Sequence, residues 1–343
     1  MKIHSIKING LWGLYSLNWE LHPQVNILTG ANGSGKSTCI DTINGLLKHD
    51  DLDRSKVESS IIEFGNNSTY SAFCFEDTIE ELQQRANNDN SLLYKDLWKK
   101  VQKDMKKSAR PIPQDVRIAA NMRICKLDGK NVSPEDFRSK LNIDIIRTFD
   151  IALPSSILTS KLDSYKDEGV RTELDLELHE LLTRYAYYLS ELATKVEFFL
   201  SQQSSTSIDL QYIHNLYNSK HIFEHIIEIC FSQTDKRMVV ENGHLGFRSL
   251  INDAYIPIYT LSAGEKQLLH ILLTVLLEEE KEYILLMDEP EISLHIDWQA
   301  NLIHYIQSLN PNCQIIIVTH SPSLIIAGWQ SFAKNIEDIK TRI

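Results

Sequence analysis

A glycine-rich loop between a buried strand and a helix is the feature that most constrains the fold. The apolar run "VNILTG" predicts a buried strand, and "STCIDTINGLLK" predicts a helix after it. The loop between them, "GANGSGKST" (residues 30–38), has the spacing G-x-x-x-x-G-K-S. Its glycines allow backbone N–H groups to point at phosphate oxygens, and the helix N-terminus favours the same anion. The chain is therefore expected to be an α/β protein organised around a phosphate-binding loop.

The side chains of this loop predict a nucleoside triphosphate with Mg²⁺ as the ligand. Lys36 is expected to neutralise β- and γ-phosphate oxygens, which makes it a candidate catalytic residue, and the Ser37 hydroxyl is expected to coordinate Mg²⁺. A flexible glycine turn that happens to end in Lys-Ser is the alternative, and the flanking strand and helix disfavour it. The predicted nucleotide-binding residues of the loop are Gly30, Ala31, Asn32, Gly33, Ser34, Gly35, Lys36, Ser37 and Thr38.

Two further apolar runs end in polar side chains. "YILLMDEP" (283–290) carries Asp288 and Glu289 at its end, and "IIIVTHSP" (315–322) carries His320. Strand ends of this kind form the ligand crevice of an open parallel sheet. Asp288 is therefore a predicted Mg²⁺ ligand, and Glu289 is the predicted catalytic residue that orients the attacking water. His320 is predicted to contact the γ-phosphate as a catalytic residue, although a lone histidine at a strand end is often structural.

A second turn that opens a helix, "TLSAGEKQ" (260–267), also suits an anion. It offers the hydroxyl of Ser262, close backbone approach at Gly264 and a helix N-terminus near Glu265. Residues 30–38 already provide the phosphate loop of their own subunit, so a second loop there would be redundant. Ser262, Gly264 and Glu265 are therefore predicted to contact the nucleotide of a second subunit, which makes a homodimer the expected assembly.

These motifs together resemble those of an ABC-type ATPase. The order is Walker A "GANGSGKST", signature "LSAGEKQ", Walker B "YILLMDEP", a D-loop-like "EISLH" and the His-switch "VTH". Glu265 in the signature, the N-terminal strand pair and the large middle insertion are similar to the SMC, RecF and OLD branch rather than to transporter subunits. More narrowly, "GLWGLYSLNWEL", "IIRTFD" and "VRTELDLEL" resemble small bacterial ATPases found with anti-phage systems of the Septu and retron type.

The resemblance implies a P-loop NTPase with an ABC-ATPase head, in which a mixed central sheet is flanked by helices, and a mostly helical insertion. ATP and Mg²⁺ are the implied cofactors. Two ATP molecules would be sandwiched in a head-to-tail dimer, with Ser262 and Gly264 against the γ-phosphate held by Lys36 of the other protomer. Residues 293–295 would cross that dimer interface.

The chain departs from the family pattern at two positions that bear on the site. The segment "IIRTFD" has Thr148 and Asp150 where a Q-loop glutamine is expected, and Asp150 is the candidate metal ligand there. After the first strand, this chain has Leu11-Trp12 where SMC and RecF relatives often have Phe-Arg, and Trp12 either stacks on adenine or belongs to the core. The 23 residues after His320 are too few for the Toprim nuclease domain of OLD proteins, so no nuclease activity of the chain itself is expected.

The motifs and composition shifts predict five segments. They are 1–76, the N-terminal lobe of the ATPase head with Walker A; 77–140, a helical and hairpin insertion with a basic cluster; 141–170, a strand with the Q-loop-like segment; 171–235, a helical arm; and 236–343, the C-terminal lobe with the remaining motifs.

Two patterns in the insertion and the arm leave alternatives open. Residues 95–110 concentrate basic side chains in a chain of net charge −11, which indicates either a solvated helix face or a nucleic-acid contact. Residues 171–200 have apolar side chains at heptad-like spacing, which indicates either a short coiled-coil arm or one helix packed on the core.

Taken together, the sequence predicts an ATPase that forms ATP-sandwich dimers. It would act as the sensor or regulatory subunit of a bacterial anti-phage complex and gate a separate effector, such as a nuclease or a reverse-transcriptase and non-coding-RNA complex. The alternative is a RecF- or SMC-like ATPase that clamps DNA in repair or recombination. Five scattered cysteines and the lack of a long apolar run predict a cytoplasmic protein without a membrane partner.

Overall fold

The computed structural model divides the chain into two compact units, and each is built from segments that are separated in sequence. The first contains residues 1–23, 30–142 and 335–343, and the second contains residues 24–29 and 143–334. The chain thus passes from the second unit to the first at the start of the glycine-rich loop. The structure describes residues 1–48, 53, 55–88, 95, 98–99, 101–103, 105, 117–147, 169–202, 210–241 and 244–343.

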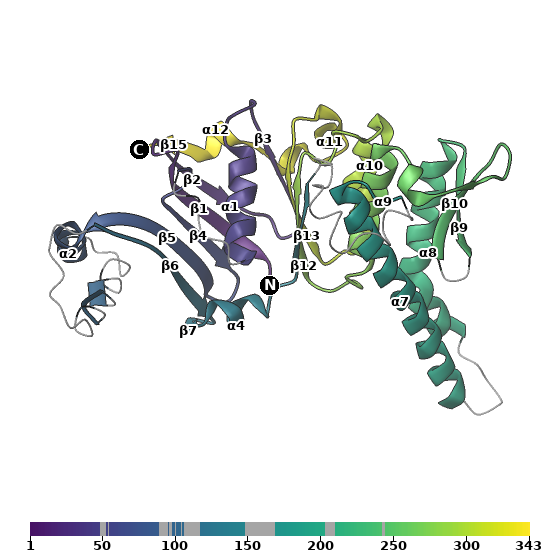
Figure 1. Cartoon of the computed structure of the whole chain (residues 1–343), viewed down its shortest axis with the longest axis horizontal. Coiled ribbons are helices and arrows are strands. Elements are labelled where there is room, and N and C mark those ends of the chain that lie inside the picture. Colours follow the sequence, from purple (N-terminus) through teal and green to yellow (C-terminus); the bar gives the residue numbers. More distant parts are fainter. Residues whose placement is uncertain are drawn as a thin grey trace. The chain divides into compact units, whose positions relative to one another are not determined.

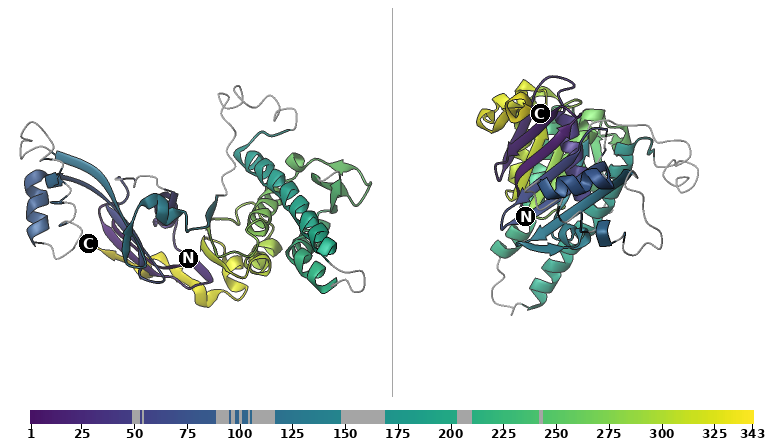
Figure 2. Two further views of the ribbon diagram at one scale, coloured as in Figure 1. Left: turned by 90° about the horizontal axis from the view of Figure 1, so that it is seen from below. Right: turned by 90° about the vertical axis from the view of Figure 1, so that its left-hand side faces the viewer.

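An antiparallel seven-stranded sheet forms the body of the first unit. Its order is β15-β2-β1-β4-β5-β6-β7. Burial along β4 alternates between buried and half-buried residues, so one face of the strand is fully covered and the other is partly exposed, as expected for period-2 side chains. The β5–β6 hairpin is the longest ribbon of the sheet and reaches the helix α2 (Ile79–Asn88) (Figures 1 and 2). The strands are β1 (Ile3–Leu11), β2 (Tyr15–Glu20), β4 (Ser59–Phe64), β5 (Ser68–Thr78), β6 (Arg117–Leu127), β7 (Lys130–Val132) and β15 (Lys340–Arg342).

Two helices of this unit are fixed to each other beside the sheet. The helix α1 (Lys36–Lys48) follows the glycine-rich loop, and the short helix α4 (Pro134–Arg138) starts at the N-cap Ser133. A guanidinium N–H of Arg138 donates to the carbonyl oxygen of Leu47 at 2.7 Å. This bond satisfies one of the carbonyls that the last turn of a helix leaves unpaired, so α4 holds the C-terminal end of α1.

A five-stranded sheet forms the centre of the second unit. Its order is β14-β3-β13-β12-β8, and β3, β13, β12 and β8 pair in parallel. Every residue of β12 and β13 is buried, as their uninterrupted apolar runs predict for a parallel sheet covered on both faces. The register pairs Asp288 with Val318 and with Arg147, so these strands end at one edge. The strands are β3 (Val25–Thr29), β8 (Ile143–Arg147), β12 (Tyr283–Asp288), β13 (Cys313–Val318) and β14 (Ala333–Asn335).

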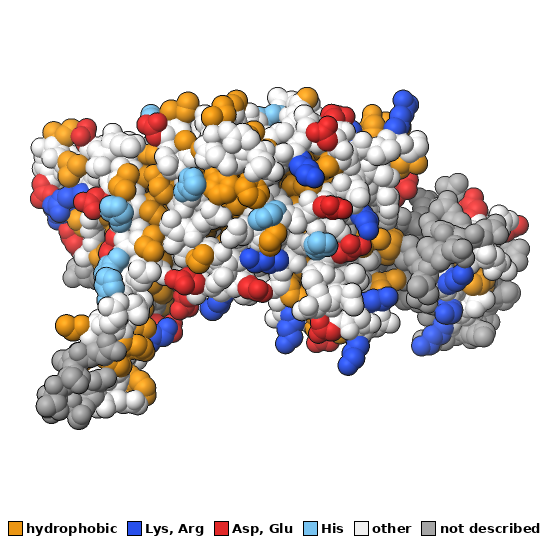
Figure 3. All heavy atoms as spheres, turned by 180° about the vertical axis from the view of Figure 1, so that it is seen from behind, with side chains coloured by type: hydrophobic (Ala, Val, Ile, Leu, Met, Phe, Trp, Pro, Cys, Tyr) orange, Lys and Arg blue, Asp and Glu red, His pale blue; other side chains and the backbone are white. Residues whose placement is uncertain are grey.

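The long helix of the predicted arm packs its first part on the core, as one of the two alternatives left open by its sequence predicts. In its last turn, the ring of Phe199 stacks on Tyr212 of the next helix at 4.2 Å. The two helices are shown in Figure 1, and a coiled-coil arm stays a prediction. Hydrophobic side chains remain at the surface of this helix pair, among them Phe198 and Leu210 (Figure 3). The helices of the unit are α7 (Glu173–Gln202), α8 (Leu210–Ser232), α9 (Ala263–Leu276), α10 (Ile296–Leu309) and α11 (Pro322–Ile326). The core residues of α7 are Leu174, Leu178, Leu181, Tyr185, Tyr188 and Leu192.

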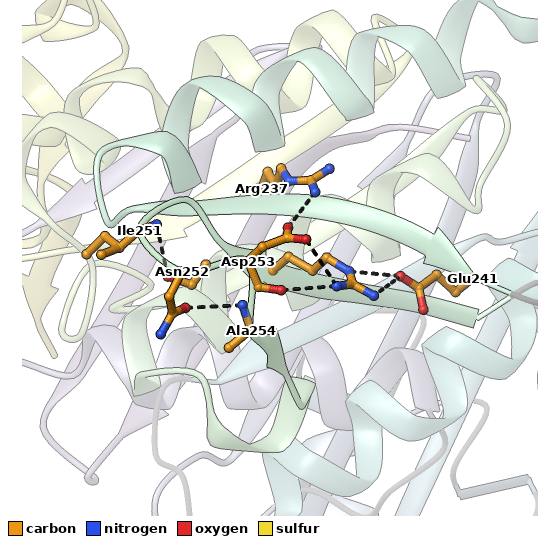
Figure 4. A network of polar contacts seen from close by, with 8 residues as sticks. Arg237, Glu241, Ile251, Asn252, Asp253 and Ala254 are labelled. Atoms are coloured by element: carbon orange, nitrogen blue, oxygen red, sulfur yellow. Dashed lines mark hydrogen bonds and ion pairs between the residues drawn. The ribbon is translucent and has the colours of Figure 1, made fainter.

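A small antiparallel sheet precedes the signature segment. It consists of β9 (Lys236–Glu241), β10 (His244–Ser249) and β11 (Tyr255–Ile256). Arg248 donates to the Glu241 carboxylate at 3.0 Å and to the backbone oxygen of Asp253, and Arg237 donates to the Asp253 carboxylate at 2.7 Å (Figure 4). The contacts to Asp253 hold the turn between β10 and β11, and the contact to Glu241 joins β10 to β9.

The strand β11 is shorter than the apolar and aromatic run that contains it. The run "YIPIYT" (255–260) reads as a continuous strand, but the strand ends at Ile256, and residues 258–260 form a 3-10 helix. Pro257 explains the difference, because it has no N–H to continue the ladder.

A buried ion pair joins α9 to the start of α7. The Lys266 ammonium lies 2.7 Å from a carboxylate oxygen of Asp175, and the two side chains are 11% and 2% exposed. The other carboxylate oxygen accepts the backbone N–H groups of Arg171 and Thr172. Both charges are therefore compensated inside the protein, as buried charges require.

Within the part of the chain that the structure describes, no helix is long and apolar enough to cross a membrane.

Replacing Lys266 with Met should lower the free energy of unfolding by about 3–5 kcal/mol, because Asp175 would keep a buried charge without its partner. Urea denaturation measures the change. Lys195→Met is the matched control, since this α7 ammonium forms solvent-accessible ion pairs with Glu191 and Glu279, and it should have little effect. The double variant Lys266→Met with Asp175→Asn should regain part of the stability, because asparagine removes the unpaired charge and keeps an acceptor for the N–H groups of Arg171 and Thr172. A Lys266→Met variant as stable as the wild type would show that the pair does not stabilise the unit.

Candidate functional site

The backbone of the glycine-rich loop has a conformation that requires glycine. Gly33 and Gly35 have φ values of +74° and +104°, in the left-handed region. A Cβ atom on Gly30 would lie 2.7 Å from a methyl carbon of Ile336, and one on Gly35 would lie 3.0 Å from the indole of Trp12. Backbone conformation therefore restricts Gly33 to glycine, space restricts Gly30, and both restrict Gly35.

The polar groups of this loop suit a phosphate ligand. Lys36 is only 4% exposed, and its ammonium donates to the carbonyl oxygens of Gly30 at 3.1 Å and Ala31 at 3.0 Å. The hydroxyl of Ser34 is buried and has no hydrogen-bond partner among the described residues. A buried hydroxyl and a buried ammonium both gain from an anion that accepts their hydrogens. Ser37 and Thr38 lie in the first turn of α1; their nucleotide contacts and the Mg²⁺ contact of Ser37 stay predictions.

Trp12 and Asp150, the candidates at which the chain departs from the family pattern, differ in that the structure describes only Trp12. Trp12 is half-buried, has a left-handed φ of 53°, and its ring packs on the backbone of Gly35. It thus lies beside the phosphate loop, and adenine stacking stays a prediction. The candidate metal ligand Asp150 and its neighbour Thr148 lie outside the described residues. The structure describes Arg147, which precedes them and pairs in register with Asp288.

At the ends of β12 and β13 the structure brings together the predicted acid and the predicted histidine. Glu289 Oε1 lies 3.2 Å from His320 Nε2, and the side chains are 23% and 34% exposed. The backbone N–H of Glu289 donates to the carbonyl oxygen of Val318 at 2.8 Å. Its φ of 48° is in the left-handed region, which costs a non-glycine residue about 1 kcal/mol or more and is typical of functional sites. Asp288, the candidate metal ligand, is the last residue of β12 and is 7% exposed.

Sequence analysis did not identify Glu291 and Gln299, which contact the turn that carries His320. The Glu291 carboxylate accepts the hydroxyl of Thr319 and the backbone N–H groups of His320 and Ser321. Gln299 on α10 accepts the hydroxyl of Ser321 at 2.7 Å. A glutamate directly after "DEP", followed by apolar residues, was a signal that sequence analysis could have used.

The signature segment begins α9 with a capping box. The Ser262 hydroxyl accepts the backbone N–H of Glu265 at 3.3 Å, and the Glu265 carboxylate accepts the backbone N–H of Ser262 at 2.9 Å. A Cβ atom on Gly264 would lie 2.1 Å from the carbonyl oxygen of Ser293, so the helix start is in direct contact with the D-loop-like segment. The structure thus places Ser262, Gly264 and the D-loop-like residues side by side in one unit; their contact with a second subunit stays a prediction.

The predicted nucleotide contact Glu265 is engaged within its own unit. Its side chain is 4% exposed, and its carboxylate accepts the Lys236 ammonium at 2.8 Å and the Thr234 hydroxyl at 2.6 Å. Burial acts to raise the pKa of Glu265, but the hydrogen bonds from Lys236, Thr234 and Ser262 outweigh it and hold the pKa below its usual range. The carboxylate is therefore charged at neutral pH, and its nucleotide contact stays a prediction.

The predicted nucleic-acid contact is only partly described. Three lysines of the basic cluster, Lys95, Lys99 and Lys103, are helical and exposed, and the others lie outside the described residues. This agrees with a solvated helix face and does not decide between the two alternatives.

A phosphate loop after a parallel strand, with an acid and a histidine at neighbouring strand ends, defines an α/β P-loop ATPase. A family model described as "AAA domain, putative AbiEii toxin, Type IV TA system" matches residues 25–327. The match covers most of the 343 residues, so the chain belongs to this family of AAA-domain proteins. The predicted fold class is thereby confirmed.

Comparison with characterised proteins gives relatives of the two predicted types. The chain is 22% identical to "Retron Vc95 probable ATPase" of Vibrio cholerae serotype O1 biovar El Tor, over 92% of this chain and 69% of the relative. It is 23% identical to "Septu protein PtuA" of Bacillus thuringiensis, over 95% of this chain and 73% of the relative. The resemblance to Septu and retron ATPases is thus confirmed.

Solved structures of SMC head domains are also similar to the chain. The SMC head domain from Thermotoga maritima has a TM-score of 0.43 at 14% identity, with 95% of this chain and 92% of that chain covered. The SMC head bound to the C-terminal winged-helix domain of ScpA has a TM-score of 0.48 at 14% identity, with the same coverage.

The variant Glu265→Gln should lower the stability of the protein by about 1–3 kcal/mol at pH 7, because Lys236 loses a charged partner. Since the folded-state pKa of Glu265 lies below the unfolded value of about 4.3, its contribution is present above that value and disappears as the pH falls through the folded-state pKa. Urea unfolding of both proteins at pH 7 and in acid should show a difference that closes at low pH.

Glu278→Gln is the control of opposite sign. Burial, and then the nearby Asp144 carboxylate, raise the pKa of Glu278, so the charged form destabilises the fold as the pH rises through its unfolded-state pKa. Relative to the wild type, Glu278→Gln should therefore lose no more stability at pH 7 than it does in acid. A Glu265→Gln effect that stays the same at both pH values would contradict the assigned ion pair.

Proposed function

We propose that the chain is an Mg²⁺-dependent ATPase that hydrolyses ATP to ADP and phosphate as part of a dimer. The observation that carries this proposal is the contact between Glu289 and His320 at the ends of two parallel strands. Phosphoryl transfer to water needs positioned groups more than covalent chemistry. The Glu289 carboxylate is such a group, because it can accept a hydrogen bond from a water and lies 3.2 Å from the His320 imidazole.

The loop of residues 30–38 is proposed to hold the triphosphate. Its backbone N–H groups and the Lys36 ammonium would bind the phosphate oxygens, with Ser37 and Asp288 as the protein ligands of the metal. Bound Mg²⁺ supplies neutralisation of the negative charge on the β- and γ-phosphates. The buried Ser34 hydroxyl and the buried Lys36 ammonium support this assignment, because both favour an anion.

The dimer is proposed to be a head-to-tail pair in which each signature segment contacts the nucleotide of the other subunit. Support comes from the packing of Gly264 on Ser293, because one rigid patch of each subunit would then supply both segments. A two-fold axis would generate two such contacts. ATP would stabilise the dimer, and hydrolysis would release it.

The biological role proposed is regulation of an anti-phage effector. The relatives named from a retron and from Septu support this role, since the chain aligns with each over more than nine-tenths of its length. The ATP-bound dimer would then be the state that a separate effector protein, such as a nuclease, recognises.

The variant Glu289→Gln should slow ATP hydrolysis by at least about 100-fold, as expected for loss of a group that handles a proton in the reaction. ATP binding should persist, so the ATP-bound dimer should accumulate in light-scattering measurements. Lys36→Ala is the comparison, because it should remove ATP binding and the dimer together. Undiminished turnover by Glu289→Gln would eliminate Glu289 as the catalytic carboxylate.

A mixture of Lys36→Ala subunits with Ser262→Arg subunits should recover part of the ATPase activity that each variant lacks alone. In such a heterodimer one composite site keeps both the intact phosphate loop and the intact signature of the partner. Turnover is measured after heterodimers are purified with two affinity tags. Heterodimers that form but remain inactive would contradict the contribution of the signature in trans.

A further inference from the structure

The turn after β13, which carries His320, is held by the side chain of Glu291, which follows β12. The strand β13 ends at Val318, and the backbone N–H of Thr319 still donates to the carbonyl oxygen of Leu28. The next two N–H groups, of His320 and Ser321, take no part in the strand pairing. Backbone donors in a buried turn need partners, and Glu291 provides them.

A single carboxylate oxygen of Glu291 gathers these donors. Glu291 Oε1 accepts the N–H of His320 at 3.0 Å, the N–H of Ser321 at 3.1 Å and the hydroxyl of Thr319. The Glu291 side chain is 7% exposed, and its other oxygen, Oε2, is buried without a hydrogen-bond partner among the described residues. Three consecutive residues are thus fixed by one buried acceptor.

Gln299 connects the same turn to the D-loop-like segment. Its side-chain N–H group donates to the carbonyl oxygens of Glu291 at 3.2 Å and Leu294 at 3.0 Å, and its oxygen accepts the Ser321 hydroxyl at 2.7 Å. Gln299 comes from the first turns of α10, so one helix fixes the segments after both strands. The contact of Glu289 with His320 therefore depends on groups that touch neither of the two side chains.

We propose that Glu291 and Gln299 form a brace that holds the His320 imidazole against Glu289, which makes Glu291 a positioning residue for hydrolysis. The inference rests on the proposed function for its consequence in catalysis. The brace itself concerns only the orientation of His320. Because Gln299 also binds the D-loop-like segment, a second subunit that moves residues 293–295 would change the orientation of His320 through it.

The test compares Glu291→Leu, which removes the acceptor, with Glu291→Gln, which keeps a carbonyl oxygen in its place. Glu291→Leu should lower kcat by about 100-fold, as misplacement of a catalytic group does, while the Kd for ATP stays unchanged. Glu291→Gln should keep most of the activity. Glu228→Leu, the same substitution at an exposed position of α8, is the matched control and should behave as the wild type.

A second measurement does not depend on turnover. In protein with ¹³C-labelled histidine, the ring signal of His320, assigned with His320→Gln, should shift in Glu291→Leu and Gln299→Met and stay in place in Glu228→Leu. Thermal unfolding shows whether each variant is folded; Gln299→Met and Glu291→Gln carry the test if Glu291→Leu is not.

The outcomes separate the brace from the proposed function. An unchanged His320 signal and unchanged kcat in folded brace variants would overturn the brace, as would a loss of ATP affinity equal to the loss of kcat. If the wild type does not hydrolyse ATP, the proposed function fails, and the His320 signal still decides whether Glu291 orients the ring.

Discussion

The parallel pairing of β12 with β13 is the constraint on which the site of the second unit depends. The register places Asp288 beside Val318, so the residues that follow the two strands emerge next to each other. The N–H of Glu289 continues this pairing by donating to Val318, and the carboxylate of Glu289 then meets His320. A shift of one residue would turn every side chain of a strand to the other face. The strands β12 and β13 therefore do more than fill the core, because their register sets the distance between the Glu289 carboxylate and the His320 imidazole.

Charged side chains at the start of α9 fix the second element of the site. The rest of this helix is buried and mostly apolar, and burial of apolar side chains has little directional preference. The Lys266–Asp175 and Glu265–Lys236 pairs are directional, and they join α9 to α7 and β9 at its first turn. Satisfied buried polar groups of this kind specify one arrangement. We infer that the signature segment is held in place by these pairs, with the packing of Gly264 on Ser293 as a third restraint.

Local patterns in the sequence predicted what depends on local chemistry. The strands β3, β12 and β13 and the glycine loop follow from apolar runs and backbone freedom. The contacts of Glu291 and Gln299 with residues 319–321 could not be predicted in this way, because they join residues 22 to 30 positions apart through a turn whose shape the sequence does not indicate. The partner of Glu265 was missed for a similar reason, since Lys236 lies on another element, 29 positions earlier. Pro257 was visible in the sequence, and its effect on the ladder should have ended the predicted strand at Ile256.

The contacts of the signature helix also bear on how Ser262 could serve a nucleotide. A serine hydroxyl has one hydrogen to donate and two lone pairs that accept. Its role as N-cap uses a lone pair, to accept from the N–H of Glu265. The hydroxyl hydrogen is not needed for the cap, so capping and donation to a phosphate oxygen are compatible. The Glu265 carboxylate would repel that phosphate if it were uncompensated, but the Lys236 ammonium at 2.8 Å and the bonds from Thr234 and Ser262 offset its charge. The glutamate of the signature is thus explained as a cap and an ion-pair partner, which leaves the helix N-terminus able to favour an anion.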